Sequence, residues 1–298
     1  MSGAGSILVT GGSGRLGQAL ARQGCTALGR DRMDITQPEQ LAAALDDFRP
    51  AAVINAAAYT AVDAAEENEV AARAINADGA GHIAACCAAA GIPLIHMSTD
   101  MVFSAGDPDH PLDEAARPSP NSVYGATKLE GELAVQAAGG RHVIARVSWL
   151  FDRTGTSFIS KMLEIAADRP VLKVVTDETG RPTDTDALAA HLVQLARHLI
   201  EAIEIPSLLH LGPGPAVSRF DWARRVFETS ARAGGPRPEL EPVTSDTFQT
   251  AAERPRGVVL DIRRADALLG PLPDWQASSD EAVRAHLAGP PSAPKGSR

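Results

Sequence analysis

The stretch Ser6-Ile-Leu-Val-Thr-Gly-Gly-Ser-Gly-Arg-Leu-Gly17 places a short apolar run directly before a glycine-rich turn and the start of a helical pattern. A strand, a glycine turn and a helix in this order are the context that a dinucleotide-binding fingerprint requires. Gly11 would permit the tight turn, Gly14 would let the backbone approach a pyrophosphate, and Gly17 would let the helix pack closely. The helix N-terminus then offers free N–H groups to the anion. An ordinary β-to-α turn is the alternative, and the strand context favours the nucleotide site.

The same alternation of apolar strands and helical segments continues through the first half of the chain. Strand-like runs occur at 7–10, 52–55, 94–98 and 142–147, with helix-like segments at 39–48, 67–90 and 126–137 between them. Thr36, three residues before Glu39, has the position of a helix N-cap. Near-continuous apolar strands separated by helices indicate a parallel sheet covered on both faces. We therefore expect an α/β fold with a Rossmann-type doubly wound sheet.

The pattern changes after about residue 149, where a smaller, interleaved C-terminal lobe is expected. Helices are predicted at 158–167, 184–201 and 280–287, a strand at 171–175, and a helix from 218 to 228 capped by Ser218. We assign 1–150 and about 170–205 to a dinucleotide-binding domain, and about 151–169 and 206–288 to a substrate-binding lobe. The Pro/Ser/Gly-rich segment 289–298 is expected to be a disordered tail.

Composition narrows the class of partner. The 298 residues are 44% hydrophobic and 22% charged, with a formal net charge of −9, which argues against a nucleic-acid or anionic membrane surface. An anionic small ligand needs only a local basic pocket. The chain has neither an apolar stretch of membrane-spanning length nor a secretory leader pattern. Its three cysteines, Cys25 and the adjacent Cys86 and Cys87, show no metal-ligand spacing, so a cytoplasmic protein with reduced thiols and no metal site is expected.

Tyr124 and Lys128 lie four residues apart and so share one face of a helix. A lysine ammonium beside a phenol lowers the pKa of the tyrosine, and a hydroxyl from Ser98 or Thr99 could orient a carbonyl that the tyrosine protonates. A tyrosine and a lysine at this spacing occur often by chance. A catalytic role for the pair is better supported when a hydride donor binds nearby. His96 and His82 lie in apolar or helical segments and are expected to be structural.

Several stretches resemble the dTDP-4-dehydrorhamnose reductase family of the extended short-chain dehydrogenase/reductase superfamily. The resemblance covers roughly residues 7 to 287. It rests on the segments 55–66, 98–103 (Ser-Thr-Asp-Met-Val-Phe), 123–128 (Val-Tyr-Gly-Ala-Thr-Lys), 146–149 and 177–183, and on Arg254-Pro255 and Leu260-Asp261.

This resemblance implies reduction of the C4 ketone of dTDP-4-dehydro-6-deoxy-L-mannose to dTDP-L-rhamnose, with hydride from a nicotinamide and a proton from Tyr124. Lys128 would hold the nicotinamide ribose and acidify Tyr124, and Thr99 would hydrogen-bond the ketone. The positions matching the family's substrate contacts are Thr99, Asp100 and Trp149, although Trp149, at the end of an apolar strand, could equally be a core residue. The positions matching its cofactor contacts are Gly11, Gly14, Arg15, Leu16, Gly17, Asp34, Ile35, Ala56, Ala57, Ala58, Tyr124 and Lys128.

The expected cofactor is NADPH, with NADH as the alternative. Arg30 follows the second strand candidate, where a guanidinium suits the 2′-phosphate of NADPH. Nearby Asp31 and Asp34 weaken that argument. Some relatives use magnesium at a subunit contact, so the resemblance leaves magnesium and a homodimer open.

Met101 argues against one related activity, the elimination of water. Sugar 4,6-dehydratases of the superfamily place an acid–base Asp-Glu pair after the threonine, whereas Asp100 here precedes a methionine that cannot exchange protons. The reductases commonly have tyrosine at that position and serine where this chain has Val258. These departures leave two alternatives: a 4-ketoreductase for another nucleotide-activated deoxysugar, or a non-catalytic NADP-binding regulatory subunit like methionine adenosyltransferase β.

Overall fold

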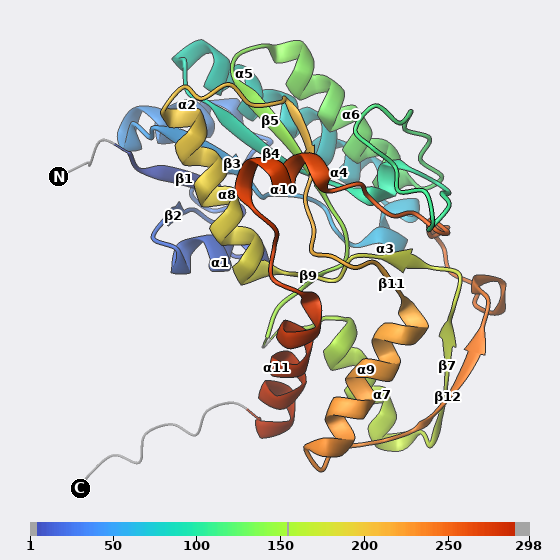
Figure 1. Ribbon diagram of the computed structural model, residues 1–298. Helices are drawn as coiled ribbons and strands as arrows, with labels where there is room; N and C mark the ends of the chain where they lie inside the picture. The colour runs from blue at the N-terminus through green and yellow to red at the C-terminus, as the bar shows by residue number, and fades with distance from the viewer. Residues whose placement is uncertain (1–4, 154, 290–298) are drawn as a thin grey trace, which may run out of the picture.

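The computed structural model describes residues 5–153 and 155–289, and its centre is a parallel sheet (Figure 1). The six strands have the order β10-β5-β4-β3-β1-β2. Their bounds are β1 (Ile7–Thr10), β2 (Thr26–Ala27), β3 (Ala52–Asn55), β4 (Leu94–Thr99), β5 (His142–Val147) and β10 (Leu208–His210). The chain runs outward from β1 to β2 and then crosses to β3 on the other side of β1, so the predicted doubly wound fold is confirmed. In such a sheet ligands bind at the carboxyl ends of the strands beside this reversal.

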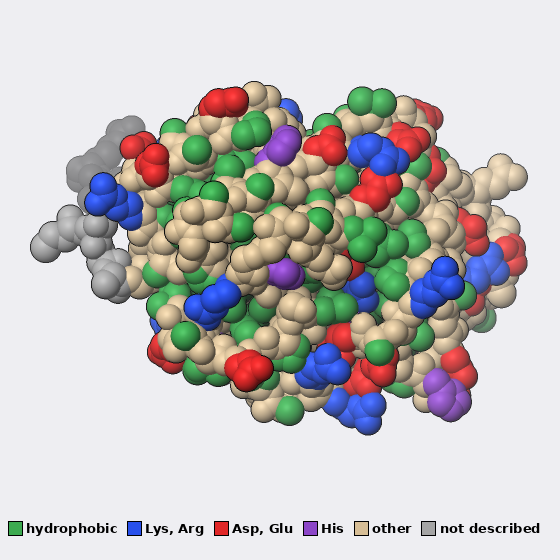
Figure 2. Space-filling view, turned by 90° about the horizontal axis from the view of Figure 1, so that it is seen from above, with side chains coloured by type: hydrophobic (Ala, Val, Ile, Leu, Met, Phe, Trp, Pro, Cys, Tyr) green, Lys and Arg blue, Asp and Glu red, His purple; other side chains and the backbone are tan. Residues whose placement is uncertain are grey.

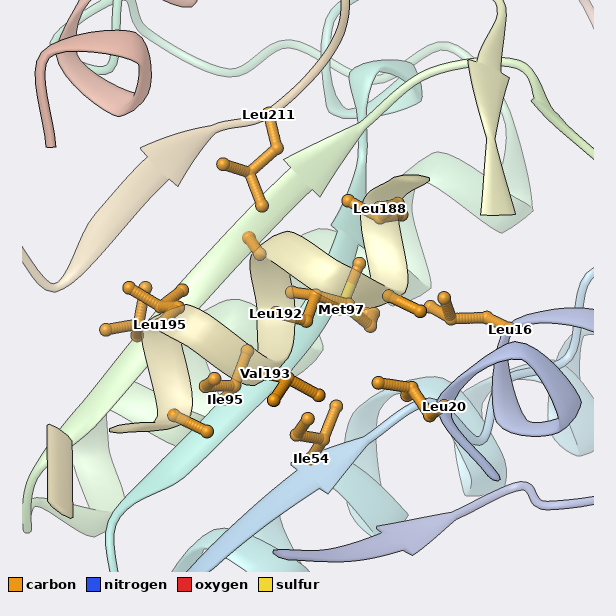
Figure 3. Packing of buried hydrophobic residues seen from close by; sticks show 14 of the residues in the cluster. Leu16, Leu20, Ile54, Ile95, Met97, Leu188, Leu192, Val193, Leu195 and Leu211 are labelled. Atoms are coloured by element: carbon orange, nitrogen blue, oxygen red, sulfur yellow. The ribbon is translucent and has the colours of Figure 1, made fainter. Parts of the chain in front are cut away.

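Helices cover both faces of the sheet. One face packs against α1 (Arg15–Arg22), α8 (Thr185–Ile200) and α10 (Arg263–Leu269), and Figure 3 shows Leu16 and Leu20 of α1 meeting Leu192 and Val193 of α8 over the strands. The other face packs against α2 (Pro38–Phe48), α5 (Gly79–Ala90) and α6 (Val123–Ala138). Burial on both faces explains why β1 and β3 are apolar except for their last residues.

A second group of elements, called the lobe below, lies beneath the carboxyl ends of the sheet in the lower half of Figure 1. It contains α7 (Phe158–Asp168), α9 (Arg219–Arg232), α11 (Trp275–Ala288) and the parallel pair β7 (Val171–Val175) and β12 (Glu239–Val243). Its own core includes Phe151, Trp222 and Phe227. Two short pairs connect its segments: β6 (Leu150–Phe151) with β9 (Thr183–Asp184), and β8 (Thr179–Gly180) with β11 (Val217–Ser218).

Strand pairing differs from the expected division at two segments. β7 was assigned to the dinucleotide-binding domain, yet it pairs with β12 in the lobe. β10 was assigned to the lobe, yet it adds to the main sheet beside β5. A short apolar run predicts a strand but not the sheet that the strand joins, because strand pairing is decided by contacts between residues distant in the sequence. The tail predicted at 289–298 lies outside the described residues except for Gly289.

The expected helix at 67–90 is instead interrupted. It divides into α3 (Val62–Glu67), α4 (Glu69–Arg73), the π-helical turn η1 (Ala74–Asp78) and α5. Within η1 the buried Asn76 accepts from the Tyr59 N–H at 2.8 Å and donates to the Thr127 hydroxyl at 3.2 Å. These bonds link the turn to the segment after β3 and to α6, which is why helical periodicity alone did not reveal the interruption.

Thr36 is not the cap of α2, contrary to the prediction. The helix begins at Pro38 with Gln37 as N-cap and without a capping side chain, while the Thr36 hydroxyl donates to Asp34 at 2.8 Å. Proline at the first helical position suits the start of a helix because its missing N–H would be unpaired there anyway. Ser218 does cap α9, by accepting from the Asp221 N–H at 3.0 Å, as predicted.

The surface carries charges of both signs, and Figure 2 shows acidic and basic side chains interspersed over one face. Two short 3-10 helices, η2 (Asp100–Val102) and η3 (Ser245–Thr247), complete the described elements. None of the helices in residues 5–153 and 155–289 is long and apolar enough to cross a membrane.

Candidate active site

A cavity of about 590 Å³ opens where the carboxyl ends of the central strands face the lobe. Its walls come from the β1–α1 turn, the ends of β3, β4 and β5, the first turns of α6, and lobe residues around α7, β8 and α9. Six of the expected cofactor positions line it: Gly14, Arg15, Leu16, Gly17, Ala56 and Ala58, besides Tyr124 and Lys128. The expected substrate positions Thr99, Asp100 and Trp149 line it as well. One cavity therefore joins the glycine turn to the Tyr124 region.

The glycine turn fits a dinucleotide diphosphate. Gly11 has φ +69°, and a Cβ there would lie 2.8 Å from the backbone of Ala57. A Cβ on Gly17 would overlap the Gly11 carbonyl, so only glycine allows α1 to begin this close to β1. Gly14 is the N-cap of α1 and contributes no capping side chain, and the first turn of α1 carries no acidic residue. The start of this helix is thus open to an anion.

The remaining cofactor positions lie outside the cavity wall. Arg30 is 74% exposed and is paired with Asp34 at 2.8 Å, and the guanidinium holds the pKa of Asp34 low against the opposing effect of partial burial. Ile35 is buried against α5, and Ala57 lies beneath the cavity with its N–H directed to Thr10 and Asn55. Arg30 is thus exposed, outside the cavity wall, and already paired with a carboxylate.

Tyr124 is placed beside Thr99 by the close approach of α6 to η2. Ser122 caps α6 by accepting from the Gly125 N–H at 3.2 Å. A Cβ at Gly125 would overlap the Met101 carbonyl, so glycine is needed for this packing. Burial raises the pKa of Tyr124 to about 12, the Thr99 hydroxyl lowers it, and the charge of Asp100 raises it further.

Lys128 is fully buried and contacts β4 instead of the Tyr124 hydroxyl. Its Nζ donates to the Met97 carbonyl at 2.7 Å and lies 3.4 Å from Nε2 of His96. Burial lowers the pKa of Lys128 to about 8, against the opposing charge of Glu132. Both side chains line one cavity, as the four-residue spacing predicts. In this structure, however, the Lys128 ammonium is bound to β4.

The hydroxyls of Ser98 and Thr99 both line the cavity, and each donates to a carboxylate. Ser98 Oγ donates to Glu132 at 2.5 Å, and Glu132 forms a buried two-point pair with Arg146 at 2.8 and 2.6 Å. Thr99 Oγ1 accepts from the Met101 N–H at 3.1 Å and donates to Asp100 at 3.1 Å. Burial raises the pKa of Asp100 to about 6, and the Thr99 hydroxyl and the Arg219 charge act in the opposite direction.

Trp149 forms an aromatic wall of the cavity. Its backbone has φ +50°, a conformation that is strained for a side chain of this size. Its ring stacks on Trp222 with a centroid distance of 5.8 Å, and a Cβ at Gly180 would lie 2.6 Å from the indole. A strained residue held by its neighbours at a cavity wall is typical of a binding site.

Arg219 is the main cavity residue that sequence reasoning missed. Its guanidinium lies 3.6 Å from the centroid of the Trp149 ring and 3.5 Å from Glu178, and burial lowers its pKa to about 10. Ser218 marks the start of α9, but no pattern in the sequence indicates that the side chain of the next residue enters the cavity. Five cationic side chains (Arg15, Lys128, Lys161, Arg219 and Arg254) and two carboxylates (Asp100 and Glu178) line the cavity. The acidic chain thus has a local basic pocket suited to phosphates.

Metal ligands do not gather anywhere in the part of the chain that the structure describes: no three His, Cys, Asp or Glu side chains are placed to hold an ion.

Comparison with known proteins identifies the family. Residues 5–287 match the family model of the RmlD substrate binding domain. The dTDP-4-dehydrorhamnose reductase of Mycobacterium tuberculosis is 39% identical over 295 residues, covering 94% of this chain and 92% of that protein. A 4-ketoreductase of Streptomyces antibioticus, named for dTDP-4,6-dihydroxy-2-methyloxan-3-one, is 37% identical over 94% of this chain and 95% of that protein.

The fold comparison agrees. A crystal structure of dTDP-4-dehydrorhamnose reductase from Bacillus anthracis in complex with NADP superposes with a TM-score of 0.81 and 29% identity, covering 93% of this chain and 97% of that chain. The chain therefore belongs to the RmlD substrate-binding domain family, the family of the dTDP-4-dehydrorhamnose reductases.

Proposed function

We propose that the chain reduces the C4 ketone of dTDP-4-dehydro-6-deoxy-L-mannose to dTDP-L-rhamnose with NADPH. A single observation carries the proposal: one basic cavity joins an open glycine turn to Tyr124 and Thr99. Relatives at 34–39% identity over nearly the whole chain are reductases for this ketone, and the Bacillus anthracis relative is in complex with NADP.

The glycine turn and Arg15 hold the cofactor. The amides at the start of α1 bind the diphosphate, and Arg15, which donates to the Thr156 carbonyl at 2.8 Å, adds charge and links this end of the cavity to the loop before α7. Ala56 and Ala58 form the wall beside the ribose. When bound, the nicotinamide supplies the hydride.

Tyr124 delivers the proton, and Thr99 orients the carbonyl. Reduction builds negative charge on the ketone oxygen, and hydroxyl donors from Tyr124 and Thr99 stabilise it. In this structure the Thr99 hydroxyl donates to Asp100, so it must rotate its one proton to the ketone oxygen when the substrate binds. Lys128 lines the same cavity as Tyr124, and its positive charge favours release of the proton from the phenol. The Trp149 ring covers the apolar face of the deoxysugar.

Reduction of a different nucleotide-activated 4-ketosugar is the second candidate. It is favoured by the Streptomyces antibioticus relative at 37% identity, which is named for another ketosugar, and by Met101, which replaces the tyrosine common in this family and lines the cavity. The hydride and proton steps would be unchanged, and only the fit of the sugar would differ.

Oxidation of NADPH at 340 nm with a panel of dTDP-4-ketosugars tests both candidates. Turnover with dTDP-4-dehydro-6-deoxy-L-mannose supports the first, and rapid turnover of only another ketosugar supports the second. Cofactor binding without turnover of any ketosugar would contradict both and favour a regulatory subunit. Initial rates with NADPH and NADH at equal low concentration test the coenzyme, and a preference for NADH would contradict the role expected of Arg30.

A further inference from the structure

A chain of four buried polar side chains runs beneath the cavity floor from β1 to α6. Thr10 Oγ1 donates to Asn55 Oδ1 at 2.6 Å, Asn55 Nδ2 lies 3.0 Å from His96 Nδ1, and His96 Nε2 lies 3.4 Å from Lys128 Nζ. Each of the four is at most 2% exposed. The three strand residues come from neighbouring strands β1, β3 and β4, so the fold fixes their spacing.

The amide of Asn55 has one orientation that satisfies its neighbours. The Ala57 N–H can only donate, and it lies 3.3 Å from one side-chain atom of Asn55, which marks that atom as the oxygen. The Thr10 hydroxyl donates to the same oxygen. A reversed amide would place its NH₂ against the Ala57 N–H and leave the Thr10 proton without this acceptor. The NH₂ group therefore faces His96.

This orientation determines the tautomer of His96. The Asn55 NH₂ donates to Nδ1, so Nδ1 must carry a lone pair, and a neutral imidazole then carries its proton on Nε2. Burial and the charge of Lys128 hold the pKa of His96 well below its usual value, so the ring is neutral. The edge that meets Lys128 is consequently an N–H.

We propose that His96 is a positioning residue for Lys128: with its tautomer fixed by Asn55 and Thr10, its Nε2–H faces the lysine nitrogen and favours the neutral amine over the ammonium. An ammonium has no lone pair for this donor, whereas an amine does. The Met97 carbonyl accepts from either form. The catalytic meaning of this arrangement rests on the proposed function, because Lys128 must be charged to help Tyr124 release its proton.

Other charged or titratable groups lie near His96 and Lys128, and some favour the protonated form of these side chains whereas others oppose it. Glu132 on α6 favours the ammonium, and burial opposes it. His142 on β5 disfavours a charged His96, and Tyr124 on α6 lines the same cavity as Lys128. Glu132 is itself paired with Arg146 of β5, which reduces its pull on Lys128. His96 is the group that meets Lys128 Nζ directly.

The tautomer can be observed in the cofactor-free protein. Two-dimensional ¹⁵N–¹H NMR of ¹⁵N-histidine protein distinguishes the two nitrogens of each ring, and loss of a signal in His96→Gln assigns His96 among the eight histidines. We expect the Nε2–H form. An Nδ1–H form in the unaltered protein would overturn the proposal. The measurement is made on the unaltered protein, and His96→Gln is needed only to assign the signal.

The coupling to Lys128 is tested by titration. The chain has four lysines, Lys128, Lys161, Lys173 and Lys295, so ¹³Cε-lysine NMR resolves them, and Lys128→Met assigns the signal. In Asn55→Asp the carboxylate accepts from Nδ1–H, the His96 tautomer reverses, and the Lys128 titration should move up by about one pH unit or more. Asn76→Asp is the matched control, because it places a carboxylate at a similarly buried position away from His96.

The outcomes separate this proposal from the proposed function. A reversed tautomer with a Lys128 titration shifted more in Asn55→Asp than in Asn76→Asp supports it. Equal shifts in the two variants would mean that charge alone acts on Lys128, and would overturn it. Neither result requires turnover. If the protein also reduces a ketosugar, the alkaline limb of its rate should move with the Lys128 titration.

Discussion

Tyr124 holds its proton tightly in the cofactor-free protein, because its phenol is desolvated and faces the carboxylate of Asp100. A protonated donor at neutral pH is what ketone reduction needs at its start, since the proton must still be present when the hydride arrives. Release then depends on positive charge nearby. Lys128 is the buried cation of the same helix and the same cavity.

Replacement of Tyr124 by phenylalanine should remove the proton donor and leave the cavity shape nearly unchanged. We expect kcat to fall by roughly 10²–10⁴-fold, the usual contribution of a general acid, with NADPH affinity altered by less than about threefold. Steady-state kinetics and fluorescence titration of NADPH measure the two quantities. Tyr59→Phe, at the other tyrosine of the chain, is the control. Unchanged kcat in Tyr124→Phe would show that another group supplies the proton.

The pKa of about 8 for Lys128 predicts the alkaline side of the pH profile. Below that pH the amine is protonated and supports proton release from Tyr124, and above it the charge is lost. The rate of ketosugar reduction should therefore fall as pH rises through about 8, at saturating NADPH. Lys128→Arg keeps a positive charge throughout this range, so whatever activity it retains should not fall there. If the rate fell over the same pH range in Lys128→Arg as in the unaltered protein, the group that titrates there would be a residue other than Lys128.

At the scale of elements, the cavity depends on a close contact between Gly180 of β8 and Trp149, two residues after the end of β5. Trp149 keeps its strained backbone because Arg219 and Trp222 both pack against its ring and the ring rests on Gly180. Two segments that are distant from Trp149 in the sequence, β8 and α9, thus fix one aromatic ring. The ring position is a property of their packing and not of Trp149 alone.

A methyl group at Gly180 should displace that ring. In Gly180→Ala the new Cβ would lie 2.6 Å from the indole, so Trp149 must move, and we expect KM for the ketosugar to rise by about tenfold, with NADPH affinity unchanged. Gly81→Ala on α5, where the nearest atom to a new Cβ lies at 3.3 Å, is the control. Tryptophan fluorescence on substrate addition provides a second readout. An unaltered KM would mean that Trp149 does not contact the sugar.

Elements governed by local pattern were predictable, whereas features that depend on tertiary contacts were not. The strands β1, β3 and β5 match the predicted ranges because burial on both faces leaves an apolar run at each. The glycine turn and the Tyr124–Lys128 face were also visible from spacing. By contrast, Arg219 enters the cavity through the way α9 packs, and Lys128 turns toward His96 because of a hydrogen-bond chain across three strands. Periodicity carries no information about either.

At the scale of the whole molecule, the segment between β12 and α10 is tied to α3 of the sheet domain beside the cavity wall. Arg254 donates to both carboxylate oxygens of Asp63 on α3, at 2.7 and 2.6 Å, and the Ala252 N–H donates to Asp63 at 3.2 Å. Arg254 lines the cavity. The two partners are 191 residues apart in sequence, so the contact exists only when sheet domain and C-terminal segment are assembled around the cavity.

Loss of this link should affect substrate binding more than stability. The side chains of Arg254 and Asp63 are 26% and 49% exposed, and solvent-screened pairs of this kind contribute about 1 kcal/mol or less, so Asp63→Asn should unfold at nearly the denaturant concentration of the unaltered protein. Its KM for the ketosugar should rise several-fold, roughly 1 kcal/mol, because the segment carrying Arg254 is no longer fixed.

Arg22→Ala is the control. It breaks another exposed pair between two elements, with Asp186 at 2.7 Å, away from the cavity, and should leave KM unchanged. Comparing Asp63→Asn, Arg254→Ala and the double variant then separates direct contact from positioning: if Arg254 acts only through its link to Asp63, all three variants have the same KM, whereas direct contact gives Arg254→Ala the higher KM of the two single variants. A KM in Asp63→Asn equal to that of the unaltered protein would show that the link plays no part in holding the substrate.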